Sequence, residues 1–145
     1  MAACQDEEIQ RWTRVPAPYT EADARAFVAQ TDETAFAVVD AETGEFLGMI
    51  GARLYGERVV DIGYWVKPDA RGRGVASRAL RLLARWAIEE ADAGRVQLST
   101  EPDNTASQRV AEKAGFQREG VLRALMEFKG RRRDAVMYSL LPNDL

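Results

Sequence analysis

A strand pattern, a glycine–arginine turn and an amphipathic helix follow one another in the middle of the chain, and this order most constrains the fold. Residues 59–66 (VVDIGYWV) are rich in β-branched and aromatic side chains, which favour a strand. The segment 71–74 (RGRG) comes shortly afterwards. Apolar residues then recur at helical spacing, namely Leu80, Leu83, Ala84, Ala87, Ile88 and Ala91. Because residues 95–100 (RVQLST) alternate like a strand, the sequence predicts a βαβ crossover, which places two parallel strands in one sheet.

The remaining segments predict an α/β fold, with α+β character, in one domain spanning residues 1–145. We expect residues 5–12 to be the tail of a helix, ended by Pro16 and Pro18, and Gly94 to stop the central helix. Two more helices are predicted at residues 21–30, with Thr20 as N-cap, and at residues 105–115. The other predicted strands are residues 34–40, 46–55, 117–128 and 134–141, with turns at 41–45, 56–58 and 129–133.

The inventory of reactive side chains excludes several kinds of catalysis. The chain has no histidine, so it has no Ser-His-Asp triad and no HExxH metal site. Cys4 is the single cysteine, which rules out an internal disulfide and a cysteine-rich zinc site. We interpret Cys4 as a small apolar residue and expect no metal. Any catalysis must therefore use carboxylates, hydroxyls, backbone amides or solvent.

Charge is distributed unevenly along the chain. The net charge is −3, yet residues 70–88 hold five arginines and no acid. A basic patch on an acidic protein favours a specific anionic ligand over nucleic acid. No apolar run approaches the ~18 residues of a membrane span. The acidic start lacks the features of a signal peptide, so we expect a cytoplasmic protein with no membrane partner.

The glycine–arginine turn has the placement of a phosphate-binding loop. A strand, a bare turn and a helix start present free N–H groups and a favourable dipole to an anion. Arg71, Arg73 and Arg78 can add charge-assisted hydrogen bonds. The P-loop pattern is absent, because no Lys-Ser or Lys-Thr occurs, and the GxGxxG pattern fails at Ser77.

Three segments together resemble the GCN5-related N-acetyltransferase (GNAT) family. Residues 71–76 (RGRGVA) fit its [Q/R]-x-x-G-x-[G/A] signature. Residues 62–77 (IGYWVKPDARGRGVAS), 101–107 (EPDNTAS) and 111–123 (AEKAGFQREGVLR) look like the ribosomal-protein N-terminal acetyltransferase (RimJ/RimL-like) branch, in the same order and spacing. The resemblance covers most of the chain from about Asp6 onward.

The resemblance implies acetyl-CoA as co-substrate and a site for it. In the family, backbone amides of the loop hold the pyrophosphate, and a bulged strand end, here near Val66, splays from the next parallel strand to pair with the pantetheine. Asn104 is implied to lie by the pantetheine, and Ser107 to face the thioester sulfur, although both residue types are also ordinary helix caps. The implied cofactor-binding residues are Trp65, Val66, Lys67, Arg71, Gly72, Arg73, Gly74, Val75, Ala76, Ser77, Asn104 and Ser107.

Transfer to an amine requires a group that removes a proton from the attacking ammonium. Without histidine the candidates are Asp61, Glu127 and Glu101, each of which is otherwise a solvated surface acid. The resemblance ranks Asp61 first, because branch members often carry Glu directly before IGYW, and Glu127 second, because some relatives place a catalytic Glu close to it. Alternation places Asp61 on one face of its strand and Tyr64 on the other. Tyr64 and its neighbour Trp65 are interpreted as walls of an acceptor channel or as core. Many relatives carry a general-acid tyrosine in the helix after residue 104, and here Ala111 stands near its place. Either Ser107 or water supplies the acid, or the thiolate leaves without assistance.

These observations predict an N-acyltransferase in which an amine attacks acetyl-CoA directly, with a backbone amide near Val66 stabilising the oxyanion. The alternatives are a non-catalytic acyl-CoA-binding or regulatory module and an RG-type nucleic-acid binder that uses residues 71–85 and 130–133. The acceptor stays open between a peptide or protein N-terminus and a small-molecule amine. Family domains open with a strand that this sequence lacks, so we expect an open sheet edge and a homodimer that covers it.

Overall fold

A six-stranded mixed sheet forms the centre of the molecule in the computed structural model, which describes residues 1–29 and 34–145. The strand order is β1-β2-β3-β4-β6-β5, and only β3 and β4 run parallel. This topology confirms the predicted βαβ crossover and mixed sheet. In chain order the helices and strands are α1 (Glu7–Trp12), α2 (Glu21–Ala29), β1 (Thr34–Val39), β2 (Phe46–Tyr55), β3 (Val59–Val66), α3 (Val75–Glu89), β4 (Arg95–Thr100), α4 (Thr105–Lys113), β5 (Gln117–Phe128) and β6 (Arg131–Leu140).

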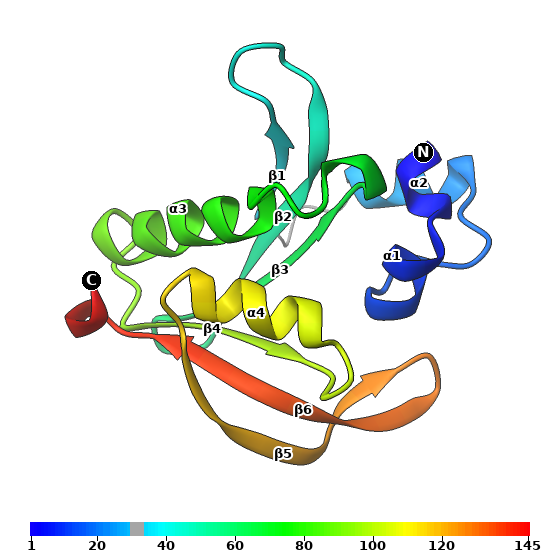
Figure 1. Cartoon of the computed structure of the whole chain (residues 1–145). Coiled ribbons are helices and arrows are strands. Elements are labelled where there is room, and N and C mark those ends of the chain that lie inside the picture. The colour runs from blue at the N-terminus through cyan, green and yellow to red at the C-terminus, as the bar shows by residue number, and fades with distance from the viewer. Residues whose placement is uncertain (30–33) are drawn as a thin grey trace.

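The helices α3 and α4 lie across the same face of the sheet, as Figure 1 shows. The predicted apolar stripe of α3 is buried there, and Leu80 and Ala84 are fully shielded from solvent. They pack with Val96 and Leu98 of β4 and with Tyr138 of β6 in one core cluster. Figure 1 also shows α1 and α2 gathered at one end of the sheet, next to the segment that joins β3 to α3. The core therefore holds the start of α3 rigidly against the ends of the parallel strands.

Several element boundaries differ from the sequence prediction, and the ends of α3 and α1 are the clearest cases. The helix α3 ends at Glu89 and does not reach Ala91 or Gly94. Asp92 takes the left-handed conformation (φ 56°), and the N–H of Ala93 bonds the carbonyl of Ala87 at 2.9 Å, which closes the helix earlier. Residues 5–12, predicted as a helix tail, contain the start of a short helix instead, because the Asp6 side chain caps α1 by accepting the N–H of Ile9 at 3.0 Å.

The last hairpin also has a shorter turn than predicted. Lys129 and Gly130 both have positive φ (49° and 75°), as a two-residue hairpin turn requires. The arginines 131–133, predicted as turn, are therefore strand residues of β6. The helix predicted at residues 21–30 is found as α2, and Gln30 lies outside the described residues.

One edge of the sheet is formed by β1, which pairs only with β2. Among residues 1–29 and 34–145, no strand precedes α1, in agreement with the sequence prediction. Over the same described ranges, every helix is too short or too polar to cross a membrane.

Three strands are joined on one face by an ion pair around Glu119 of β5. Arg95 of β4 donates two hydrogen bonds to this carboxylate, at 2.8 and 2.6 Å, and Ser139 of β6 donates a third at 2.6 Å. The Arg95 and Ser139 bonds lower the pKa of Glu119 to about 2. The charged form of Glu119 is thus held by groups from β6, its neighbour in the sheet, and from β4 beyond it.

We expect Glu119→Gln to destabilise the protein at neutral pH but not in acid. The folded pKa lies below the unfolded one, so the stabilisation is complete above the unfolded value of 4.5 and is lost as the pH falls toward about 2. Because solvent screens this half-exposed pair, the effect is about 1 kcal/mol or less. Urea unfolding of both proteins at pH 7, 5 and 3 measures it. A difference in the free energy of unfolding that stays constant across this range would contradict the assignment.

Candidate active site

The segment between β3 and α3 presents bare backbone at a helix start. Gly72 and Gly74 have left-handed φ values of 72° and 74°. Gly74 is the N-cap of α3, and no side chain caps this end. The first N–H groups of a helix have no partner within the helix, so those of Val75, Ala76 and Ser77 are available to an anion. A Cβ atom at Gly72 would have no neighbour within 4 Å, which shows open space beside the loop.

Arg71 is held within the protein. Its guanidinium forms an ion pair with Asp6, the N-cap of α1, and its Nε donates to the carbonyl of Val66 at 3.3 Å. The side chain therefore ties α1 to the end of β3. This contact gives Arg71 a structural task that the sequence did not predict, because Asp6 lies far away along the chain.

The other predicted cations differ in their partners. Lys67 pairs with Glu45 at 2.5 Å. Arg78 donates to the backbone carbonyl of Arg73 at 3.1 Å and so braces the loop from the first turns of α3. The pKa of Asp40 is lowered mainly by hydrogen bonds within its own turn, and the positive charge of Arg73 makes a smaller contribution. The Arg73 side chain thus lies close enough to the turn between β1 and β2 for its charge to act on Asp40.

The parallel strands β3 and β4 separate directly beside this loop. They pair only from Val59 to Asp61 on β3, opposite 95–97 on β4. The N–H of Lys67 bonds Leu47 of β2 at 2.9 Å, so alternation along the ladder turns the backbone groups of Val66 and Tyr64 toward β4. Because β4 has already diverged there, these groups face an opening between the strands. The splay implied by the resemblance is present.

The bulge implied near Val66 is not present. The ladder between β2 and β3 keeps one register from the pair Tyr55 and Val59 to the pair Gly48 and Val66. A Cβ at Gly48 would lie 2.3 Å from the carbonyl oxygen of Trp65, so glycine lets β2 follow β3 closely along this stretch. The opening arises because β4 turns away, and no extra residue in β3 is needed.

Two hydroxyl groups meet on the helical side of this opening. The Tyr64 hydroxyl lies 2.9 Å from Oγ of Ser107 and 3.3 Å from the Ser107 carbonyl oxygen. Ser107 sits in the first turn of α4, and its N–H is accepted by the Asn104 side chain at 3.1 Å. Asn104 thus acts as the helix cap, one of the two roles that the sequence left open for it. Burial raises the pKa of Tyr64 to about 12.

Asp61 lies on the other face of β3, at the last paired position before the strands separate. Its half-buried carboxyl has a raised pKa, because burial outweighs the Gln97 hydrogen bond and the charges of Arg53 and Arg14. Gln97 lies 3.5 Å away and is itself held by Arg95, which donates to its side-chain oxygen at 2.9 Å. A carboxylate that is partly desolvated in this way has the character of a general base.

The other candidate bases are placed differently. Glu101 is buried and forms an ion pair with Arg133 of β6 at 2.7 Å, which occupies its carboxylate. Glu127 lies in the exposed β5–β6 hairpin, 3.7 Å from Arg132. This hairpin reaches α1, where Lys129 donates to a backbone carbonyl. The structure therefore brings only Asp61 directly to the point where β3 and β4 part.

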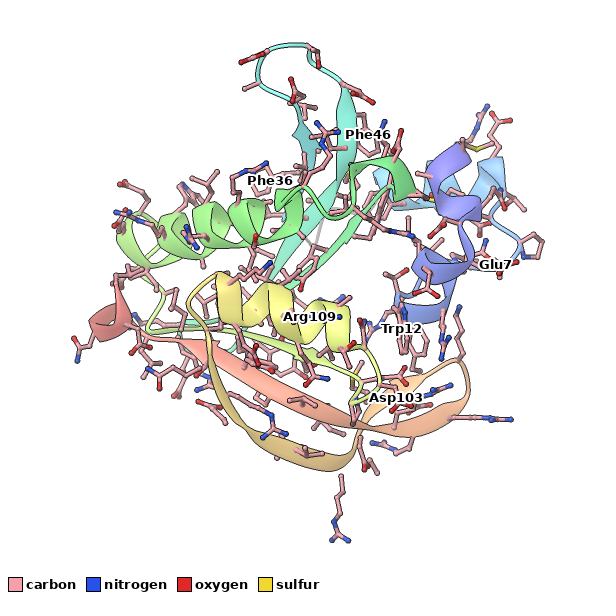
Figure 2. The ribbon with its side chains drawn as sticks, in the orientation of Figure 1. Glu7, Trp12, Phe36, Phe46, Asp103 and Arg109 are labelled. Atoms are coloured by element: carbon pink, nitrogen blue, oxygen red, sulfur yellow. The ribbon has the colours of Figure 1, made fainter. Side chains whose placement is uncertain are left out.

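Segments far apart in the sequence lie at one end of the sheet. Figure 2 shows Glu7 and Trp12 of α1, and Asp103 of the loop before α4, at the same end of the sheet. Trp65 packs edge-to-face on Phe46, with ring centroids 5.9 Å apart, so its side chain has a partner in the hairpin of β1 and β2. Within the described residues, no three metal-binding side chains cluster.

The sequence missed the pairing of Tyr64 with Ser107. Alternation along β3 predicted that Tyr64 shares a face with Ile62 and Val66, and this is confirmed, because Ile62 and Tyr64 both join the core beneath the helices. The partner of Tyr64 lies 43 residues further along the chain. No local pattern carries that information.

Comparison with known proteins agrees with this geometry. A family profile described as "Acetyltransferase (GNAT) domain" matches residues 1–117. The N-acetyltransferase p20 of Bacillus licheniformis is 28% identical over 96% of this chain and 83% of its own length. YdaF of Bacillus subtilis, named for ribosomal N-acetyltransferase activity, is 34% identical over 70% of this chain and 56% of its own length.

Solved structures show the same fold. An acetyltransferase of the GNAT family from Bacillus anthracis superposes with a TM-score of 0.85 at 26% identity, over 96% of this chain and 84% of that one. The resemblance noted in the three sequence segments is therefore confirmed. The chain belongs to the GNAT family of N-acetyltransferases.

Proposed function

We propose that this protein transfers an acetyl group from acetyl-CoA to a primary amine, at a peptide or protein N-terminus or on a small molecule. The observation that carries the proposal is the opening between β3 and β4 beside the uncapped, glycine-rich start of α3. The loop offers N–H donors and a positive dipole end for a diphosphate. The opening offers strand backbone, at Tyr64 and Val66, that can pair with the amides of an extended chain.

The residues present fit acetyl-CoA. Bound acetyl-CoA would supply a thioester whose carbonyl carbon a neutral amine can attack. In this proposal Gly72, Gly74 and the first turn of α3 bind the diphosphate, with Arg73 as an added cation. Lys67 and Arg71 are already paired with Glu45 and Asp6, so we assign them to shaping the loop.

The chain's own groups can assist the transfer from both faces of the opening. Asp61 accepts the proton of the incoming ammonium, directly or through water, on the face away from α3 and α4. The N–H of Val66 points into the opening as a donor for an oxygen that gains negative charge. Ser107, on the helical face, offers its hydroxyl to the leaving sulfur. Asp61 and Ser107 lie on opposite faces of the opening. The amine can therefore enter from the Asp61 face, and the thiolate can leave on the Ser107 face.

The acceptor class rests on the relatives. YdaF and a ribosomal-protein-serine acetyltransferase of Escherichia coli, which is 32% identical over 46% of this chain, are named for ribosomal substrates. By analogy, a protein N-terminus is the acceptor that we place first. The alternative function is an acyl-CoA-binding or regulatory module without turnover. It is favoured by one observation: α4 has Ala111 near the place where many relatives carry a general-acid tyrosine.

Calorimetric titration with acetyl-CoA, followed by a thiol-release assay with peptides, lysine, polyamines and amino acids, tests the proposal. We expect micromolar binding and turnover with at least one amine class, since substrate constants of enzymes fall between about 1 μM and 1 mM. Binding without thiol release for any amine would favour the non-catalytic module. No binding by a protein with the circular dichroism of a folded α/β domain would contradict both.

A further inference from the structure

We propose that Tyr64 is the positioning residue of Ser107: its phenol donates a hydrogen bond to Oγ of Ser107 and thereby directs the serine hydroxyl hydrogen into the opening between β3 and β4. The inference rests on the proposed function and names a part of that site. It concerns a residue that the sequence assigned only to the core or to a channel wall.

The two distances from the Tyr64 hydroxyl favour the phenol as the donor to Oγ. Oγ of Ser107 lies at 2.9 Å and the Ser107 carbonyl oxygen at 3.3 Å. Hydroxyl donors bond oxygen at about 2.5–3.0 Å, so the first contact is a full hydrogen bond and the second is long. If Ser107 donated to Tyr64, the phenol would be left with only the long contact. With Tyr64 as donor to Oγ, the phenol makes the shorter hydrogen bond and the hydroxyl hydrogen of Ser107 is left for a third group.

The other polar groups of Ser107 are already engaged. Its N–H is accepted by Asn104 at 3.1 Å, and its carbonyl lies within α4, where it accepts from the next turn. With Oγ accepting from Tyr64, the hydroxyl hydrogen of Ser107 is the one donor left without an assignment. In this proposal it rotates toward the opening between β3 and β4.

Tyr64 is built to remain a donor. Its ring packs with the main core cluster beneath α3 and α4, which fixes the position of its hydroxyl. Burial raises its pKa to about 12, so the phenol stays neutral under any ordinary assay condition. Tyr64 gives up no proton in this scheme. It polarises Ser107 and orients its O–H toward the sulfur that leaves with the bonding electron pair.

The variant Tyr64→Phe isolates the hydroxyl, because the ring and its packing remain. We expect kcat to fall about 10-fold while KM for acetyl-CoA stays within about twofold, as for a group that acts in the transition state only. Ser107→Ala should lower kcat at least as much. The double variant should match Ser107→Ala, because Tyr64 acts through Ser107. Ser107→Thr, which keeps the hydroxyl, should restore most of the rate.

Tyr138→Phe is the matched control. Tyr138 is fully buried in the same core cluster and donates its hydroxyl hydrogen to Glu112 at 3.1 Å. Its variant should lower stability and leave kcat unchanged. A wild-type kcat in Tyr64→Phe, or a double variant whose loss is the product of the two single losses, would overturn the inference. A wild-type enzyme without turnover for any amine would instead refute the proposed function, and the inference would fall with it.

Discussion

Acetyl-CoA binding is expected to weaken by at least about 100-fold when Gly74 is replaced by glutamate. Gly74 caps α3 with a φ of 74° that residues with a side chain rarely adopt. Its new Cβ would lie 3.1 Å from Nη1 of Arg78, the group that braces the loop through the carbonyl of Arg73. The added carboxylate would also repel a diphosphate at the helix start. Calorimetry with acetyl-CoA measures the loss.

Gly56→Glu is the control that distinguishes an effect at the α3 loop from the effect of backbone strain alone. Gly56 has a similar φ of 54° and open space around it, and lies in the turn between β2 and β3, at the far end of β3 from the loop. The substitution adds the same charge and the same strain. We expect it to lower the melting temperature and leave the affinity for acetyl-CoA within about twofold of wild type. Equal losses in both variants would mean that the α3 loop is not where acetyl-CoA binds.

Local sequence patterns were sufficient to predict most of the fold. The apolar spacing of α3 and the alternation in β3 each report on neighbours along one element, so the crossover and the face of Tyr64 could be predicted. Boundaries failed where one residue took an unusual conformation. Asp92 closes α3 early and Lys129 shortens the last hairpin, and both are non-glycine residues with positive φ. Such positions have no sequence signature as clear as glycine.

The site was predictable only in part, because its decisive contacts join distant segments. The loop motif lies within a few residues of sequence, and the structure shows its glycines as expected. The pairing of Arg71 with Asp6 and of Tyr64 with Ser107 spans 65 and 43 residues. The ranking of Asp61 before Glu127 and Glu101 came from the resemblance, because members of the branch often carry Glu directly before the IGYW segment. The burial of Asp61 raises its pKa and gives that ranking a physical basis, and burial depends on packing between segments far apart in the sequence.

The substitution Asp61→Asn is expected to lower turnover by about 100-fold or more while acetyl-CoA binding is retained. The amide has nearly the shape of the carboxyl and can still accept the Gln97 side chain, which lies 3.5 Å away. It cannot accept a proton from an ammonium. If Asp61 is the base, the loss of kcat should shrink as the pH rises toward the pKa of the acceptor, where the amine is already neutral. A kcat that matches wild type across this range would exclude Asp61 as the base.

The same variant should be more stable than the wild type at neutral pH. The folded pKa of Asp61 lies above the unfolded value of 3.8, so the folded protein holds this proton more tightly. Its contribution to stability is therefore complete below pH 3.8 and is lost as the pH rises through the folded pKa. Asparagine carries no charge to bury, so the melting temperatures of the two proteins should diverge on going from acid to neutral pH. If Asp61 served only to attract Arg53 and Arg14, the Asn variant would instead be less stable than the wild type at neutral pH. A variant that loses turnover and gains stability would therefore identify a carboxylate retained for chemistry at the expense of the fold.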